Sequence, residues 1–280
     1  MSVFSTATGI GSWPGTEPRQ AAEVVVGELH TLTHLVELPD RGIGADVIGR
    51  AGALLVDLGV DTVARGYRIT PGRRSSALRR AVSLLGEDID AIEEAWERAG
   101  LRGSGRVVKV QSAGPITLAA QLELTGGHRA ITDRGALRDL AASLAEGLSV
   151  HLAEVARRLD TPVVVQLDEP SLPAALAGRL TGVTSLTPVH PVDEPLAMSL
   201  IDDCVSSVGT EVAVHCCAPG LPWKGLLRSA VHAVAVDPAT LTPADLDGIG
   251  EFVESGRTVL LGVVPATAPE RRPVDRDHPG

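Results

Sequence analysis

The feature that most constrains the fold is an apolar run over residues 161–167 (TPVVVQL), which ends in Asp168, Glu169 and Pro170. A run that is apolar at successive positions is typical of a strand buried on both faces. Such strands occur mainly in parallel sheets covered by helices, because the crossover between two parallel strands is usually a helix. This run therefore predicts a parallel α/β architecture.

Strand-like and helix-like segments alternate along most of the chain. Helical stripes occur in several segments, and the clearest covers residues 133–159 with Asp133 as its predicted N-cap. Residues 59–84 are harder to assign, and the arginines among Gly, Pro and Ser over residues 65–80 predict a long loop or excursion with a solvated face. The predicted strands number seven, near Gly9, Val36, Val108, Val164, Val214, Val234 and Leu260.

This order predicts an α/β fold of the (β/α)8 TIM-barrel type that lacks the eighth strand and helix. An open, doubly wound sheet is the alternative. We expect residues 1–264 to form a single catalytic barrel. Residues 265–280 carry four prolines and many charges with few apolar residues, so they predict a disordered tail.

Composition excludes several classes of protein. The net charge is −10 and no long Lys/Arg cluster occurs, which argues against a nucleic-acid partner. No apolar run is long enough to span a bilayer, and no secretory signal pattern begins the chain. The three cysteines, two of them adjacent, form no disulfide framework, which favours a cytoplasmic protein.

Polar residues follow the predicted strands, and in a parallel barrel these ends converge on one mouth. The residues expected there are Ser12, Glu37, Ser112, Asp168, His215, Cys217 and Asp237. His215 and Cys217 are two positions apart on a strand, so they project to the same face while Cys216 points away. An imidazole and a thiolate on one face suit a soft cation such as zinc, although a buried cysteine beside a satisfied histidine is the simpler interpretation.

Four motifs resemble those of the cobalamin-independent methionine synthase family, in the same order as in its catalytic barrel. They are residues 10–14 (IGSWP), 112–117 (SAGPIT), 166–170 (QLDEP) and 215–217 (HCC). The resemblance covers about residues 8–264. The N-terminal barrel of the long enzymes has no counterpart here.

The resemblance implies zinc-dependent transfer of a methyl group to the thiol of homocysteine, which gives methionine. It implies that Ile10, Ser12, Glu37 and Asp168 bind the amino acid, with Asp168 on its ammonium group. It also implies that His215, Cys217 and Asp237 bind zinc, with aspartate where the family has glutamate. The methyl donor is expected to be methyltetrahydrofolate or a methylcobalamin carried on a corrinoid protein.

The family's last cysteine ligand has no match in this chain, and Cys216 is a poorly aimed substitute. A truncated or frame-shifted copy, a homodimer that closes the barrel, and a degenerate paralogue are the three explanations. The alternative functions are a catalytically silent protein that binds an amino acid or zinc, and an enzyme like uroporphyrinogen decarboxylase. Arginines at 65, 68, 73 and 74 are the only support for the last of these.

Overall fold

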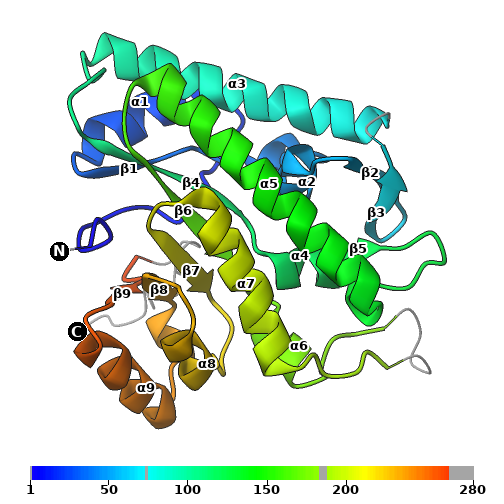
Figure 1. The fold of residues 1–280 in the computed structure, drawn as a ribbon. Coiled ribbons are helices and arrows are strands. Elements are labelled where there is room, and N and C mark those ends of the chain that lie inside the picture. The colour runs from blue at the N-terminus through cyan, green and yellow to red at the C-terminus, as the bar shows by residue number, and fades with distance from the viewer. Residues whose placement is uncertain (1, 73–74, 183–187, 265–280) are drawn as a thin grey trace, which may run out of the picture.

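The computed structural model describes residues 2–72, 75–182 and 188–264. Its centre is a six-stranded sheet in the order β1-β4-β6-β7-β8-β9, and all its neighbouring strands are parallel. The strands are β1 (Leu32–His34), β4 (Val107–Ala113), β6 (Val163–Asp168), β7 (Val212–Cys216), β8 (Ala233–Val236) and β9 (Thr258–Leu261). The sheet curls into part of a barrel (Figure 1), and β1 and β9 are not paired with each other in the described ranges. The predicted α/β barrel without closure is therefore confirmed.

The strand predicted near Gly9 is not a regular strand. Its segment pairs with the chain after β1 through a single parallel bridge between Ser12 and Glu37. The Trp13 amide donates to the Glu37 carbonyl at 2.8 Å, and the Glu37 amide donates to the Gly11 carbonyl at 3.0 Å. In the described part of the chain, two backbone hydrogen bonds thus join the segment around Gly11–Trp13 to the chain that follows β1, in the place where a further strand was predicted.

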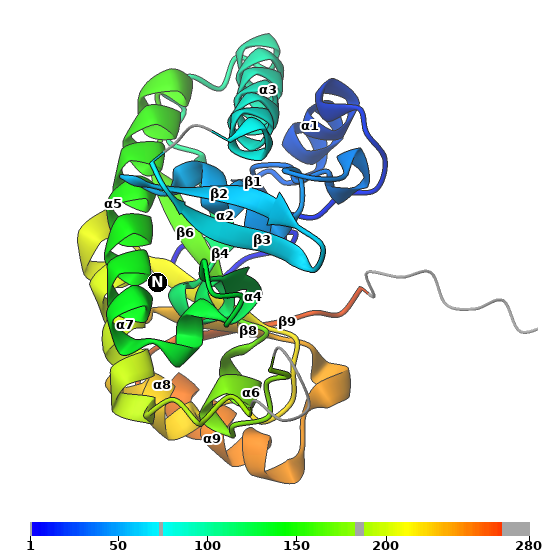
Figure 2. The ribbon, with the colours of Figure 1, turned by 90° about the vertical axis from the view of Figure 1, so that its right-hand side faces the viewer.

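Helices cover the outer side of the sheet, where α3, α5 and α7 lie side by side (Figures 1 and 2). The longest, α5 (Arg134–Leu159), is capped as predicted, because the Asp133 carboxylate accepts from the amides of Gly135 and Ala136. All the leucines of its predicted stripe are buried. The helices are α1 (Pro18–Glu28), α2 (Val47–Leu54), α3 (Ser76–Arg98), α4 (Pro115–Gln121), α5, α6 (Leu172–Leu176), α7 (Glu194–Val208), α8 (Trp223–Arg228) and α9 (Pro243–Glu254).

The prediction of a long loop over residues 65–80 is wrong for the part of that range that the structure describes. β2 (Leu58–Val63) and β3 (Gly66–Pro71) form an antiparallel hairpin, and β5 (Leu122–Glu123) adds to β3 in parallel. Helix α3 then begins at Ser76, where the Ser75 hydroxyl caps it by accepting from the Leu78 amide at 2.9 Å. Arginines conceal this pattern, because Arg65 is exposed at the turn between the two strands and Arg79 and Arg80 are exposed in the first turns of α3.

Within the described ranges, no helix is both long enough and apolar enough to cross a membrane. The tail predicted over residues 265–280 lies outside the described residues. The assignment of residues 1–264 to one domain stays a prediction.

Candidate functional site at the carboxyl ends of the strands

The carboxyl ends of β6 and β7 bring two predicted site residues together. Asp168 and His215 are direct partners in the register of these strands. The His215 Nδ1 atom lies 2.7 Å from the Asp168 Oδ1 atom, and both side chains are mostly buried. Gln166, two residues earlier on β6, donates its amide Nε2 to the same Asp168 oxygen at 2.8 Å. Two groups therefore hold Oδ1, and within the described part of the chain Oδ2 has no hydrogen-bond partner.

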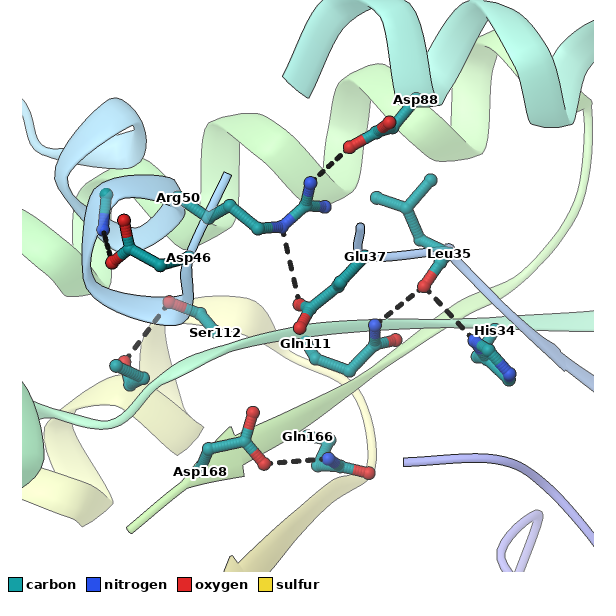
Figure 3. Close-up of polar contacts among 12 residues, drawn as sticks. His34, Leu35, Glu37, Asp46, Arg50, Asp88, Gln111, Ser112, Gln166 and Asp168 are labelled. Atoms are coloured by element: carbon teal, nitrogen blue, oxygen red, sulfur yellow. Dashed lines mark hydrogen bonds and ion pairs between the residues drawn. The ribbon is translucent and has the colours of Figure 1, made fainter. Parts of the chain in front are cut away.

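Glu37 approaches the same region from the chain that follows β1 (Figure 3). Its side chain is buried, and its Oε1 atom lies 3.4 Å from Nε of Arg50, which α2 contributes. The pKa of Glu37 is raised to about 7, first by burial and also by the Asp168 carboxylate, while Arg50 and Lys109 act in the opposite direction. Glu37 and Asp168 are thus close enough to interact electrostatically.

Arg50 is itself held by a second carboxylate. Its Nη1 atom pairs with Asp88 of α3, which also pairs with Arg41. Gln111 of β4 completes this side of the site, because its Nε2 donates to the Leu35 carbonyl at 2.7 Å (Figure 3). The buried polar network fixes Glu37 from behind and leaves the region between Glu37 and Asp168 as the centre of the site.

The Ile10–Gly11–Ser12 segment forms the opposite side. Ile10 and Ser12 are exposed, whereas Gly11 is buried against Gln111. The Ile10 carbonyl accepts from Gln166 Nε2 at 2.9 Å, and the Gly9 carbonyl accepts from Lys109 Nζ at 2.7 Å. The segment is therefore anchored by side chains of β4 and β6 as well as by its two backbone bonds to the chain after β1.

The three predicted metal ligands are placed differently from one another. His215 faces Asp168, and Cys217 is exposed just beyond the end of β7. Asp237 follows β8, and its carboxylate accepts from the Ala239 amide at 2.9 Å as a cap for the next turn. Among the described residues, no group of three or more His, Cys, Asp and Glu side chains is arranged to hold a metal ion.

The other cysteines are placed as strand alternation and helix position predict. Cys216 is buried in the hydrophobic core, where burial raises the pKa of its thiol to about 12. Cys204 lies inside α7 and is also buried. Neither thiol faces the mouth, so the structure does not supply a replacement for the missing ligand within the described ranges.

Glu169 has a role separate from that of its neighbour Asp168. Its fully buried carboxylate accepts from the amides of Ile116 and Thr117 at 2.9 and 2.7 Å, and from the Thr117 hydroxyl at 2.7 Å. These amides belong to the first turn of α4, whose N–H groups have no partner within the helix. The Asp-Glu-Pro motif thus divides its carboxylates: the first faces the mouth and the second caps a helix.

Sequence reasoning missed Lys109, Gln111 and Gln166. Each is buried, and each donates hydrogen bonds to the backbone at the mouth. A signal was available, because long polar side chains inside runs of valine predict an interior lined with polar groups.

No curated protein matches this chain. It is similar to a B12-independent methionine synthase from Shewanella sp. W3-18-1, solved in complex with selenomethionine, at 14% identity and a TM-score of 0.40. That match covers 73% of this chain but 56% of the synthase, so the chain spans little more than half of that protein's length.

A methyltransferase from Methanosarcina mazei matches with 15% identity and a TM-score of 0.53, over 88% of this chain and 70% of that protein. At this identity the match indicates a shared fold. A family model described as the catalytic domain of cobalamin-independent synthase matches residues 4–276, nearly the whole chain. The motifs of residues 10–14, 112–117, 166–170 and 215–217 all lie inside that match. The chain therefore belongs to the family of the cobalamin-independent synthase catalytic domain.

Proposed function

We propose that the protein is a methyltransferase that binds L-homocysteine at the mouth of the open barrel and methylates its thiol to give methionine. Family membership supports the methyltransferase class. The observation that carries the choice of acceptor is the Asp168 carboxylate, which is fixed through one oxygen while the other has no partner among the described residues.

The residues divide the work of binding an amino acid. Asp168 Oδ2 accepts from the ammonium group, a charge-assisted hydrogen bond that is stronger than a neutral one. The exposed Ser12 hydroxyl and the backbone of Ile10 contact the carboxylate group. Glu37 adds a second carboxyl to the ammonium side, with a pKa that burial raises to about 7. The thiol then points away from these groups toward His215 and Cys217.

A bound zinc ion would deprotonate the thiol and keep it nucleophilic. The described residues fit this requirement poorly, because a tetrahedral zinc site needs three or four protein ligands and no group of three or more His, Cys, Asp and Glu side chains among them is arranged to hold a metal ion. The zinc requirement therefore stays a prediction, and the roles of the residues above do not depend on it.

The incomplete ligand set favours a second candidate, a catalytically silent protein that binds the amino acid without turnover. The methyl donor, methyltetrahydrofolate or a methylcorrinoid protein, and the homodimer that would close the barrel also stay predictions. The alternative based on arginine clamps loses support, because Arg65 pairs with Glu123 at 2.8 Å and Arg68 lies 4.0 Å from the same carboxylate. The other two arginines, 73 and 74, lie outside the described residues.

Calorimetric titration with L-homocysteine tests the proposal. We expect binding by the wild type and a loss of about 10- to 100-fold in affinity in Asp168→Asn, since a hydrogen bond between charged groups contributes about 1.5–3 kcal/mol. Asparagine keeps the Oδ1 acceptor for Gln166 and His215, so the variant removes the charge with little loss of contacts. 4-Mercaptobutanoate, which lacks the ammonium group, should bind the wild type and the variant with the same low affinity.

Turnover distinguishes the two candidates. Methionine formation with methyltetrahydrofolate or methylcobalamin selects the enzyme, and homocysteine binding without methionine from either donor selects the silent protein. Failure of the wild type to bind homocysteine would refute both.

A further inference from the structure

Lys109 is an unusual residue for the interior of a sheet. It lies in the middle of β4, its side chain is fully buried, and no ion pair within 4.0 Å joins it to a described carboxylate. Its Nζ atom instead donates to the Gly9 carbonyl at 2.7 Å and to Oε1 of Gln166. Burying an ammonium group without a carboxylate in contact is costly, and the Asp168 and Glu37 carboxylates offset part of this cost from a longer distance.

Gln166 contacts Lys109 through one end of its amide and the rest of the site through the other end. An ammonium group only donates hydrogen bonds, so Lys109 requires the oxygen of the Gln166 amide to face it. The amide nitrogen must then face the other way, toward the Ile10 carbonyl at 2.9 Å and Asp168 Oδ1 at 2.8 Å. The Ile10 carbonyl and the Asp168 carboxylate only accept hydrogen bonds, so all three contacts favour this one orientation of the amide.

The two residues link parts of the site that have few other connections. The Ile10–Ser12 segment is joined to the chain after β1 by two backbone bonds, whereas Asp168 ends β6 in the middle of the sheet. Lys109 binds the segment at Gly9, Gln166 binds it at Ile10, and Gln166 also binds Asp168.

We propose that Lys109 and Gln166 are positioning residues that couple the Ile10–Ser12 segment to Asp168, so that the carboxylate side and the ammonium side of the amino-acid pocket hold one fixed separation. The coupling itself follows from the contacts above, and only its use in homocysteine recognition rests on the proposed function.

The test uses Lys109→Met, Gln166→Leu and the double variant, each in the full chain. The matched control is Thr161→Val, because the Thr161 hydroxyl donates to the Arg106 carbonyl and so links the segments that precede β6 and β4, at the opposite end of the strands. A general effect of losing a buried hydrogen bond between these elements would appear in the control as well.

The first readout is hydrogen exchange at the amides of Trp13 and Glu37, which report the pairing of the segment and need no ligand. We expect exchange at these amides to rise about tenfold or more in each single variant, the size that losing about 1.4 kcal/mol of local stability gives. The double variant should exceed the larger single effect by less than about threefold, because the residues act through each other. Thr161→Val should leave these amides unchanged.

The second readout is the dissociation constant for L-homocysteine. The same pattern is expected: a loss of about tenfold in each single variant, non-additive in the double variant, and none in the control. If the wild type does not bind homocysteine, the proposed function fails while the exchange data still decide the coupling. Unchanged exchange in Lys109→Met, or full additivity in the double variant, would overturn the inference. If Lys109→Met does not fold, the hydrogen exchange of Gln166→Leu alone tests the coupling. Unchanged exchange at the Trp13 and Glu37 amides in that variant would also overturn the inference.

Discussion

Gly11 offers a sharp test of how the Ile10–Ser12 segment is built. It has a positive φ of +121°, and a Cβ atom added there would lie 2.9 Å from Cδ of Gln111 and closer still to its amide nitrogen. Alanine at this position therefore meets both backbone strain and a buried neighbour. Gly15 is the matched control, because it has a φ of +88° but no atom within 4 Å of an added Cβ.

The two contributions have separable sizes. Strain from a sparsely populated backbone conformation costs about 1–3 kcal/mol at either glycine. At Gly11 the Gln111 side chain must also move, and it then loses its 2.7 Å bond to the Leu35 carbonyl. Leaving a buried polar group without its partner costs about 1–3 kcal/mol more. We therefore expect Gly11→Ala to lower the free energy of unfolding by about 2–6 kcal/mol and Gly15→Ala by about 1–3 kcal/mol.

Urea denaturation measures both values, and an unchanged m-value would exclude an altered unfolded state. The affinity for homocysteine, measured without urea and at a temperature where both variants are folded, should fall only in Gly11→Ala. Equal destabilisation in the two variants would refute the argument, because it would mean that the contact with Gln111 contributes nothing.

Three further outcomes are expected. Gly147→Ala should destabilise the fold by about 1–3 kcal/mol, since an added Cβ would overlap the backbone of Leu54 at the end of α2. The control Gly86→Ala, at a position in α3 where an added Cβ meets no atom within 4 Å, should be neutral or stabilising, and equal melting temperatures of the two variants would contradict this. Burial, and after it Arg50, lowers the pKa of His151 to about 4. The folded state therefore binds fewer protons than the unfolded state between about pH 6.5 and 4, and the free energy of unfolding falls as the pH falls through that window. His151→Gln should flatten this part of the curve of stability against pH by an amount on the order of 3 kcal/mol, and an unchanged curve would contradict the prediction. Elemental analysis of protein purified without chelator should find zinc that is lost in Cys217→Ser if the metal prediction holds, and a folded wild type free of zinc would reject it.

The sequence predicted the sheet well where burial alone determines a strand. β6 and β7 have nearly uniform apolar runs, so their strands and the polar residues at their ends could be placed from the pattern of valines. The β2–β3 hairpin was missed because arginines at outward positions conceal an alternation that only becomes visible once Val60 and Tyr67 are seen to be buried.

The sequence predicted that Asp168 and Glu37 lie at the site, but it did not predict the roles of Lys109 and Gln166, which hold the site in place. Asp168 ends β6 inside one of the four motifs, whereas Glu37 follows β1 outside them and was expected from its place after a strand. Lys109 and Gln166 act from within strands, and their roles depend on where the Gly9 and Ile10 carbonyls lie. Side-chain periodicity carries no information about a backbone oxygen in an irregular segment, so no pattern in the chain could have paired them.

The divided roles of Asp168 and Glu169 have a consequence for folding. A shift of β6 by one position against its neighbours would exchange the directions of the two carboxylates, as it does for every side chain of a strand. The capping carboxylate would then leave the amides of Ile116 and Thr117 unpaired in the core, while the mouth would receive the longer acid. A sheet with β6 in the wrong register is thus destabilised through the loss of the Glu169 cap. A chain in which Glu169 caps α4 therefore also has Asp168 at the mouth.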